Sequence, residues 1–191
     1  ISYKNSFGKH NIDARAFARY YRNEEAGSDY SSQQSASSNR YLAYNFQGTY
    51  DYANRYIASF NLSRMGCDNF SPDDRWGTFW GASAGWVLTE EPWAKNNGVL
   101  DLFKVRLSYG EAGQSNTGAG RYPYQSIYGS ATGYAFGYNA TGVGGYAETK
   151  TGNLNSKWEI SKMVNVGFDW NLWNKKLYGS LDIFHEWRSN I

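Results

Sequence analysis

Three pairs of adjacent carboxylates are the residues of this chain that could perform acid–base chemistry: Glu24–Glu25, Asp73–Asp74 and Glu90–Glu91. Hydrolysis by two carboxyl groups requires both to converge on one bond. Adjacent residues of an extended chain point to opposite faces, so these pairs do not converge. No Gly-x-Ser-x-Gly, His-Glu-x-x-His or glycine-rich phosphate loop accompanies them. We therefore interpret the pairs as solvated loop carboxylates, and we expect no enzymatic activity and no catalytic residues.

A metal site is the second chemistry to consider. Asp68, Asn69, Asp73 and Asp74 place four oxygen ligands of the kind that calcium prefers in one segment. Their spacing matches no known calcium loop, so we interpret them as residues of a solvated loop. Two histidines and one cysteine argue against zinc sites built from several imidazoles or thiolates. We expect neither a metal nor a cofactor, and we take Cys67 to be an unpaired thiol.

Tyrosines in a glycine-rich segment form a candidate binding surface. Tyrosine on such a backbone makes an adaptable, amphipathic surface, as it does in antibody loops. These rings could stack on sugars or hold a covering protein, or the loop could instead pack on its own neighbours. The tyrosines that we expect to contact a ligand or a covering protein are Tyr122, Tyr124, Tyr128, Tyr134 and Tyr138.

The composition restricts the elements that can position these residues. The chain has 191 residues, enough for one or two domains, and its net charge of +2 gives no argument for nucleic-acid binding. No run of 18 apolar residues predicts a membrane-spanning helix, and the first residues lack the apolar core of a signal peptide. Aromatic residues make up 18% of the chain, with 21 glycines and only three prolines. This composition is typical of strands that touch lipid and carry aromatic girdles.

Period-two alternation of apolar and polar residues predicts strands along the chain. In one segment Phe103, Val105 and Leu107 alternate with Lys104 and Arg106. No stretch shows a convincing helical period, and tyrosine, phenylalanine and tryptophan favour extended chain. Each predicted strand is close to the length that crosses a bilayer when tilted. The eight segments are 2–7, 11–21, 41–52, 55–64, 76–88, 102–109, 158–170 and 177–187.

The connections between these strands alternate in length. Short connections fall at 8–9, 53–54 and 171–176, and an intermediate one at 89–101. We expect long outer loops at 23–39, 65–75 and 112–157. Outer-membrane barrels sort their connections in this way, with short periplasmic turns and long outer loops, whereas a soluble sandwich has no reason to do so.

Aromatic residues lie near the ends of the predicted strands, while small and aliphatic residues occupy the centres. This is the arrangement of two girdles at the membrane interfaces. The girdle residues that we predict are Tyr20, Tyr50, Tyr52, Tyr56, Trp76, Trp86, Tyr109, Trp158 and Trp170. The opposite strand faces carry charges such as Arg15, Lys104, Arg106 and Asp182. A small, tightly filled barrel would bury these charges at high cost, so they favour a large barrel with a wet lumen.

Several ordered motifs resemble one family. Residues 64–70 are similar to an Arg-Asp-Gly-Ser-Ser-x-Phe stretch, 102–113 to a Lys-Leu-Arg-x-Ser-Tyr-Gly-x-x-Gly strand, and 165–169 to an Asn-x-Gly-x-Asp strand. The order and spacing of the set, over nearly the whole chain, resemble the SusC/RagA-like, TonB-linked outer-membrane transporters. Three residues depart from the family pattern: Met65 replaces an Asp, Cys67 replaces the first Ser, and Gln114 replaces the Asn that follows the last Gly of the second motif. These departures leave the fold interpretation intact.

The resemblance implies an all-β fold, a transmembrane antiparallel β-barrel. About eight strands would be present as part of a plugged barrel of about 22 strands. Residues 1–191 would then belong to the barrel domain, with the plug and the TonB-contact segment absent. The resemblance also implies a Gram-negative outer membrane, contact with outer-membrane lipid, and import of glycans or peptides energised through TonB. A SusD-like surface lipoprotein would be the partner.

Two alternatives remain open from the sequence. One is a complete small outer-membrane barrel for adhesion or structure, in which residues 2–7 would pair with 177–187. The other is a soluble, β-rich carbohydrate-binding module, which would expose fewer tryptophans.

Overall fold

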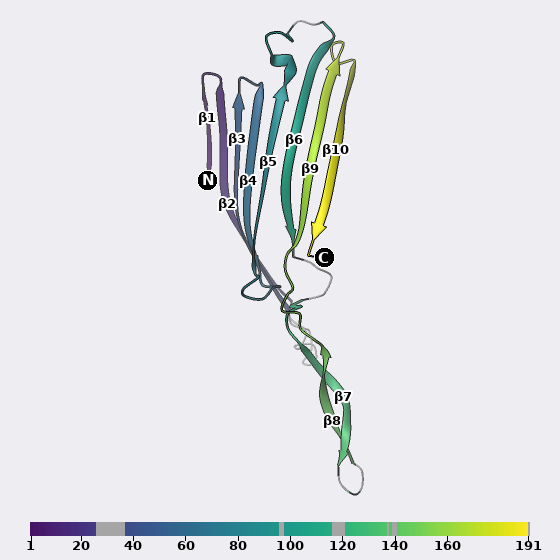
Figure 1. Cartoon of the computed structure of the whole chain (residues 1–191). Coiled ribbons are helices and arrows are strands. Elements are labelled where there is room, and N and C mark those ends of the chain that lie inside the picture. The colour runs from purple at the N-terminus through teal and green to yellow at the C-terminus, as the bar shows by residue number, and fades with distance from the viewer. Residues whose placement is uncertain (26–36, 96–97, 116–120, 137, 139–140, 191) are drawn as a thin grey trace.

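A computed structural model describes residues 1–25, 37–95, 98–115, 121–136, 138 and 141–190. Eight strands form one antiparallel sheet (Figure 1). In sheet order they are β1 (Ser2–Phe7), β2 (His10–Glu25), β3 (Ser37–Tyr52), β4 (Tyr56–Cys67), β5 (Trp76–Val87), β6 (Leu100–Gln114), β9 (Glu159–Leu172) and β10 (Leu177–Ser189). The prediction of an all-antiparallel sheet of about eight strands is confirmed.

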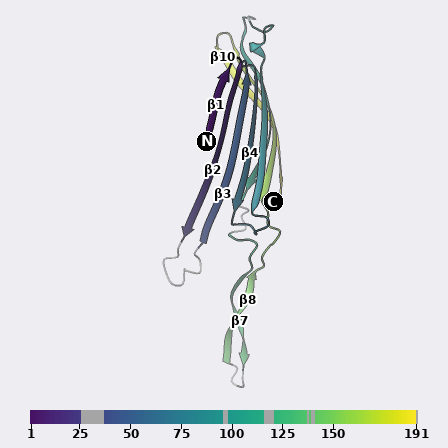
Figure 2. The ribbon, with the colours of Figure 1, turned by 90° about the vertical axis from the view of Figure 1, so that its left-hand side faces the viewer.

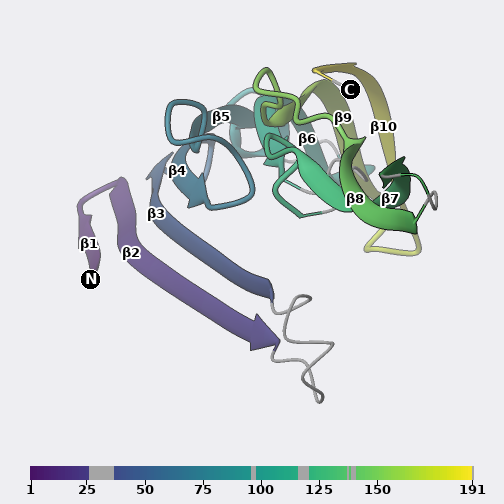
Figure 3. The same ribbon diagram turned by 90° about the horizontal axis from the view of Figure 1, so that it is seen from below.

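The eight-stranded sheet is an open arc (Figure 3). β1 and β10 are its two edges, and each pairs with a single neighbour, β2 and β9 respectively. A complete small barrel requires pairing between residues 2–7 and 177–187, which the structure does not have. The arc is consistent with part of a larger barrel.

The two ends of the sheet differ in their connections (Figures 1 and 2). At one end, short turns use left-handed backbone, with φ of +61° at Gly8, 57° at Ala53 and 55° at Asn54. Such turns match the right-handed twist of the strands that they join. The β5–β6 connection at this end contains a single turn of 3₁₀ helix, η2 (Leu88–Glu90). No helix among the described residues is long and apolar enough to span a membrane.

A β-hairpin lies within the range 112–157, where the sequence predicts only a long connection. Its strands, β7 (Ile127–Phe136) and β8 (Thr141–Lys150), pair with each other and form a separate two-stranded sheet. The hairpin extends away from the end of the large sheet that is opposite the short turns (Figure 1). It therefore places residues 127–150 beyond the strand ends.

The register of the large sheet separates its side chains onto two faces. One row across the strands contains Ile12, Tyr50, Ala58, Ala84, Leu107, Val166 and Ile183. The next row, one residue along, contains Asp13, Thr49, Ser59, Ser83, Ser108, Asn165 and Phe184. Successive residues of a strand point to opposite sides, so these rows define an apolar face and a polar face.

A small aromatic core lies at the long-loop end, on the polar face. Phe70 is fully buried, and Cys67, Phe79 and Trp158 are 3–5% exposed. The Trp158 ring packs against Phe70 and Phe79 at centroid distances of 5.3 and 5.5 Å. Trp158 Nε1 donates a hydrogen bond to the Arg75 carbonyl at 3.2 Å. The prediction that Trp158 is a girdle residue at the membrane interface was therefore wrong, because its ring is buried in this core.

Candidate functional site

Asn69 joins two connections that are distant in the sequence. Its side-chain nitrogen donates to the Ser115 carbonyl at 3.1 Å, and its side-chain oxygen accepts from the Tyr122 backbone N–H at 3.0 Å. Asn69 is only 6% exposed. Next to it, Arg121 Nη2 and Asp68 Oδ1 form an ion pair at 3.1 Å. These contacts hold residues 121–125 against the β4–β5 connection.

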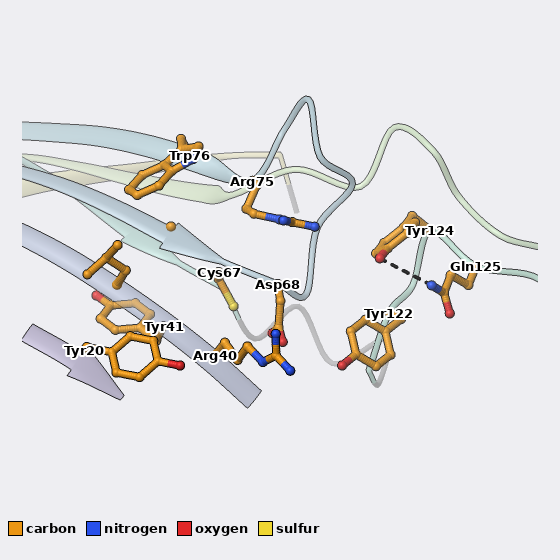
Figure 4. Close-up of a pocket in the computed structure, with 12 residues that line it drawn as sticks. Tyr20, Arg40, Tyr41, Cys67, Asp68, Arg75, Trp76, Tyr122, Tyr124 and Gln125 are labelled. Atoms are coloured by element: carbon orange, nitrogen blue, oxygen red, sulfur yellow. Dashed lines mark hydrogen bonds between the residues drawn. The ribbon is translucent and has the colours of Figure 1, made fainter. Parts of the chain in front are cut away.

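A cavity of about 440 Å³ lies between the docked segment and the ends of β2–β5 (Figure 4). Tyr122, Tyr124 and Gln125 line it from the segment, facing the strand ends. The strands and the β4–β5 connection contribute Tyr20, Arg40, Tyr41, Leu42, Gly66, Cys67, Asp68, Arg75 and Trp76. Rings, guanidinium groups and one amide converge here. Such a lining suits a ligand that combines sugar-like faces with negative charge.

The structure separates the five predicted contact tyrosines into two groups. Tyr122 and Tyr124 line the cavity, and their rings meet edge to face at 6.2 Å. Tyr128 and Tyr134 lie on β7, and Tyr138 lies between β7 and β8. Tyr128 is 66% exposed and Tyr138 is fully exposed. Tyr128 and Tyr138 therefore lie outside the cavity.

Most of the predicted girdle aromatics fall on two rows of the apolar face. Tyr52, Tyr56 and Trp86 share one row, and Tyr20 and Trp76 share another, through Leu42 and Gly66. The rows lie ten residues apart along β3 and β4. Ten residues span about 34 Å of strand and, at a tilt of about 40°, about 26 Å of height. This height matches the apolar band of an outer-membrane barrel, about 25 Å.

The remaining girdle residues lie at neighbouring positions. Tyr50 is two residues from Tyr52 on the same face of β3 and is 39% exposed. The Tyr109 ring packs at a tilt of 49° against Trp80 of the neighbouring strand, with a centroid distance of 5.0 Å, and its hydroxyl donates to Glu111 Oε1 at 2.7 Å. Trp170 lies near the short-turn end of β9, opposite Phe103. The girdle assignment of these residues, like that of the residues in the two rows, stays a prediction.

Charged side chains connect three strands on the polar face. Arg106 of β6 contacts Asp169 of β9 through two hydrogen bonds of 2.8 and 2.9 Å, and reaches Asp182 of β10 at 3.2 Å. Asn165 also donates to Asp182, at 3.1 Å. Gly167 lies beneath this group, where a Cβ would come within 2.6 Å of Asp182. These side chains are about one-third exposed, so the polar face offers a hydrated, charged surface.

Glu91 forms a clamp at the short-turn end. Its carboxylate accepts hydrogen bonds from Tyr56 Oη at 2.6 Å, Trp86 Nε1 at 3.1 Å and Arg55 Nη1 at 3.1 Å. Glu91 is only 5% exposed, so the expectation that it is a solvated loop carboxylate was wrong. The hydrogen bond from Tyr56 holds the pKa of Glu91 below its ordinary value despite burial. The hydrogen bond from Trp86 and the positive charge of Arg55 lower this pKa further.

The pH dependence of folding tests this clamp. A carboxyl group whose pKa is lower in the folded than in the unfolded chain stabilises the fold above its unfolded pKa. That contribution is lost as the pH falls through the folded pKa. Glu91→Gln should therefore unfold at lower denaturant concentration than the parent protein at neutral pH, and the gap should close below the ordinary carboxyl range.

Glu90→Gln is the matched control for this measurement. Glu90 makes an exposed ion pair with Lys95 at 2.9 Å, which contributes little. Denaturant unfolding of both variants at several pH values measures the gap. A gap that is independent of pH, or equal for the two variants, would contradict the role of the Glu91 carboxylate.

The residues considered for metal binding have other partners. Asp68 pairs with Arg121, Asp74 pairs with Lys157 at 3.6 Å, and Asn69 joins the two connections. No group of three or more His, Cys, Asp or Glu residues is arranged to hold a metal within the part of the chain that the structure describes. Cys67 is a buried free thiol of the aromatic core.

Comparison with known proteins finds relatives that are TonB-dependent receptors. The chain is 34% identical over 152 residues to the TonB-dependent receptor SusC of Bacteroides thetaiotaomicron, covering 77% of this chain and 15% of the relative. It is 28% identical to the TonB-dependent receptor P3 of Formosa agariphila, covering 96% of this chain and 20% of the relative. No protein-family model matches.

Solved structures give the same fold. The structure of the RagAB peptide transporter superimposes with a TM-score of 0.78 at 18% identity, covering 96% of this chain and 22% of the other. The RagAB peptide importer in its open-open state gives the same TM-score at 16% identity. The chain thus spans between 15% and 22% of the length of these proteins.

Proposed function

This chain is homologous to the SusC/RagA-like TonB-dependent receptors and matches a partial stretch of their β-barrel, and from this we propose that it forms part of the wall of an outer-membrane importer. The separation of apolar and polar side chains onto two faces carries this proposal. The apolar face would contact lipid, and the polar face would line a hydrated lumen.

The two open edges support a larger barrel. In a bilayer, unpaired backbone groups of an edge strand cost several kcal/mol each, so a spanning sheet must close. β1 and β10 therefore require further strands from the same receptor. A soluble carbohydrate-binding module fits less well, because Trp76, Trp80 and Trp86 are 39–42% exposed on the apolar face.

The size of the native protein tests this part of the proposal. Extracted from the outer membrane with detergent, these residues should belong to a species several times heavier than the 21.6 kDa of this stretch. A detergent-dependent species of 21.6 kDa would contradict the large barrel. A species that needs no detergent would contradict membrane insertion as well.

We assign import of glycans or peptides, driven through TonB, to the complete receptor. A SusD-like surface lipoprotein would cover the long-loop end. The exposed hairpin tyrosines Tyr128 and Tyr138, with Tyr134 on β7, would contact this lipoprotein or the substrate, and Tyr122 and Tyr124 would do so closer to the strand ends.

Shortening the hairpin tests the partner assignment. β7 and β8 pair only with each other, so replacing residues 128–149 by a short glycine linker should leave the large sheet intact. We expect the shortened receptor to retain less than one-tenth of the lipoprotein that co-purifies with the parent receptor. Tyr178→Ala, an exposed tyrosine at the opposite end, is the control. Full retention by the shortened receptor would show that the hairpin does not contact the lipoprotein.

A further inference from the structure

The 440 Å³ cavity lies over the end of the large sheet, because residues of both faces line it. Leu42 and Trp76 belong to the apolar face, whereas Tyr41 and Cys67 belong to the polar face. Tyr41 and Cys67 are also the last pair of the β3–β4 ladder, so the cavity begins where the paired strands end. The docked segment 121–125 borders it on the side away from the strands (Figure 4). A ligand would therefore reach it from the long-loop end of the sheet.

Two arginines of the lining have side chains without a partner among the described residues. Arg40 is exposed and forms neither an ion pair nor a side-chain hydrogen bond with any of them. The Nε of Arg75 is buried and has no hydrogen-bond partner in the described part of the chain. Buried donors are nearly always paired in folded proteins, so this nitrogen is available to an acceptor on a ligand. Both side chains line the cavity, which therefore has positive charge and free donors.

The acidic residue among the described lining residues is already paired. Asp68 Oδ1 forms an ion pair with Arg121 Nη2 at 3.1 Å, and Arg121 belongs to the docked segment. Arg22 lies opposite Arg40 in the sheet, but it is paired with Glu24 and does not line the cavity. The positive charge of the lining therefore comes from the two arginines without partners, and an anionic group of a ligand would balance it.

Aromatic rings form much of the remaining lining and favour a sugar over a small inorganic anion. Tyr122 and Tyr124 line the cavity from the docked segment, and Tyr20, Tyr41 and Trp76 line it from the strands. Tyrosine and tryptophan rings combine an apolar face with a polar edge, which suits the apolar faces and the hydroxyl groups of a sugar ring. The volume is in the range of small-molecule pockets, and a phosphate or sulfate ion would leave most of it unfilled.

We propose that this cavity binds an acidic sugar, a ring that carries a carboxylate, and that the complete receptor captures acidic oligosaccharides there. Arg40 and Arg75 hold the carboxylate, because guanidinium N–H groups match its planar geometry. Tyr122 and Tyr124 contact the sugar faces. Extended peptides are bound mainly through main-chain hydrogen bonds to a strand edge, whereas side chains from strand ends and a loop line this cavity.

Binding of matched acidic and neutral oligosaccharides to the complete receptor tests the site. The probes are galacturonate and glucuronate oligosaccharides, from disaccharides to tetrasaccharides, and the same compounds with every carboxylate methyl-esterified. Isothermal titration calorimetry in detergent measures their affinities. We expect the acidic forms to bind at least about tenfold more tightly than the esters, because esterification removes the charge that the guanidinium groups bind. This comparison uses the parent protein and does not depend on how any variant folds.

Variants of the lining assign the two parts of the sugar. Arg40→Gln and Arg75→Gln should each weaken binding of the acidic forms about tenfold and leave binding of the esters unchanged. Tyr124→Ala should weaken both forms, since it removes a ring that contacts the sugar in either case. Arg22→Gln is the matched control, because Arg22 is exposed, paired with Glu24 and outside the described lining. It should bind the acidic forms within about twofold of the parent.

Absence of binding by the acidic forms, or equal affinity for acidic and esterified forms, would overturn the proposal. So would arginine variants that bind the acidic forms as the parent does. Displacement by inorganic phosphate or acetate at equal concentration would show a site for any anion, and equal binding of a tetra-aspartate peptide would show a site for any carboxylate; either result would overturn the sugar assignment.

This inference rests on the proposed function and narrows its substrate class from glycans or peptides to glycans that carry carboxylates. The size and detergent dependence of the same preparation test the proposed function separately. A large, detergent-dependent receptor that does not distinguish acidic from esterified sugars would refute the acidic-sugar site and leave the barrel-wall proposal standing.

Discussion

Leu107→Arg is expected to destabilise the membrane-inserted protein by about 2–4 kcal/mol, because it places a charge on the apolar face near the bilayer midplane. Leu107 is 53% exposed and lies in the central apolar row, between Ala84 and Val166. On β6 it lies midway between Phe103 at the short-turn end and Glu111 at the long-loop end. An arginine there is too far from either interface for its guanidinium to reach water without cost.

Ser108→Arg is the control for Leu107→Arg. Ser108 is the next residue on the same strand and lies in the polar row with Ser83 and Asn165. Folding of the complete receptor into lipid vesicles, followed by denaturant titration, measures both variants. Ser108→Arg should change stability by less than about 0.5 kcal/mol. Equal destabilisation by the two substitutions would mean that the faces are not lipid-facing and water-facing.

Phe70→Ala is expected to cost about 3–5 kcal/mol, the usual range for truncating a buried phenylalanine. Phe70 is the one fully buried large side chain among the described residues, and it packs on Trp158. Its neighbours Asp68 and Asn69 hold residues 121–125. The substitution should therefore also release this segment and the cavity that it closes, which limited proteolysis would detect as new cleavage near residues 121–125.

Phe60→Ala is the control for Phe70→Ala. Phe60 lies on β4, is 42% exposed and belongs to the apolar face, where lipid can replace the lost ring contacts. Its cost should be well below that of Phe70→Ala, and protease sensitivity at 121–125 should not change. If the two variants lost equal stability, the core at the long-loop end would not be the element that holds the loops.

Period-two alternation was sufficient to predict the existence and order of the eight strands of the large sheet, but not where they end. β2, β3, β4 and β6 extend into the predicted long loops, to Glu25, from Ser37, to Cys67 and to Gln114 respectively. Each strand has one apolar side and one polar side. Because successive residues point to opposite sides, this difference is visible in the sequence as an alternation of apolar and polar residues. The sequence was less informative for β7 and β8. Gly129, Gly133, Gly142 and Gly144 interrupt the alternation there, and the register shifts between Ala131 and Tyr134.

Contacts between distant segments could not be predicted from local patterns. Asn69 contacts Ser115 and Tyr122, 46 and 53 residues away, and nothing in its neighbourhood indicates these partners. Trp158 lies next to a strand end, where an aromatic residue has the same local signature whether it faces lipid or a core. Glu91 was interpreted as one of two adjacent solvated carboxylates. Its three hydrogen-bond donors come from β4, β5 and the turn before β4, and the residues next to Glu91 in the sequence do not indicate them.

Spin-label accessibility along β6 is the most direct test of the central claim, that one face of this sheet contacts lipid and the other lines a hydrated lumen. In the complete receptor, with the buried Cys67 replaced by serine, single labels are placed at each position from Phe103 to Tyr109 and reconstituted in lipid. Oxygen accessibility should peak at Phe103, Val105, Leu107 and Tyr109, and accessibility to a water-soluble nickel complex at Lys104, Arg106 and Ser108. If nickel accessibility did not alternate from Phe103 to Tyr109, or if it were higher at Leu107 than at Ser108, the proposal that this sheet is part of a barrel wall would be contradicted.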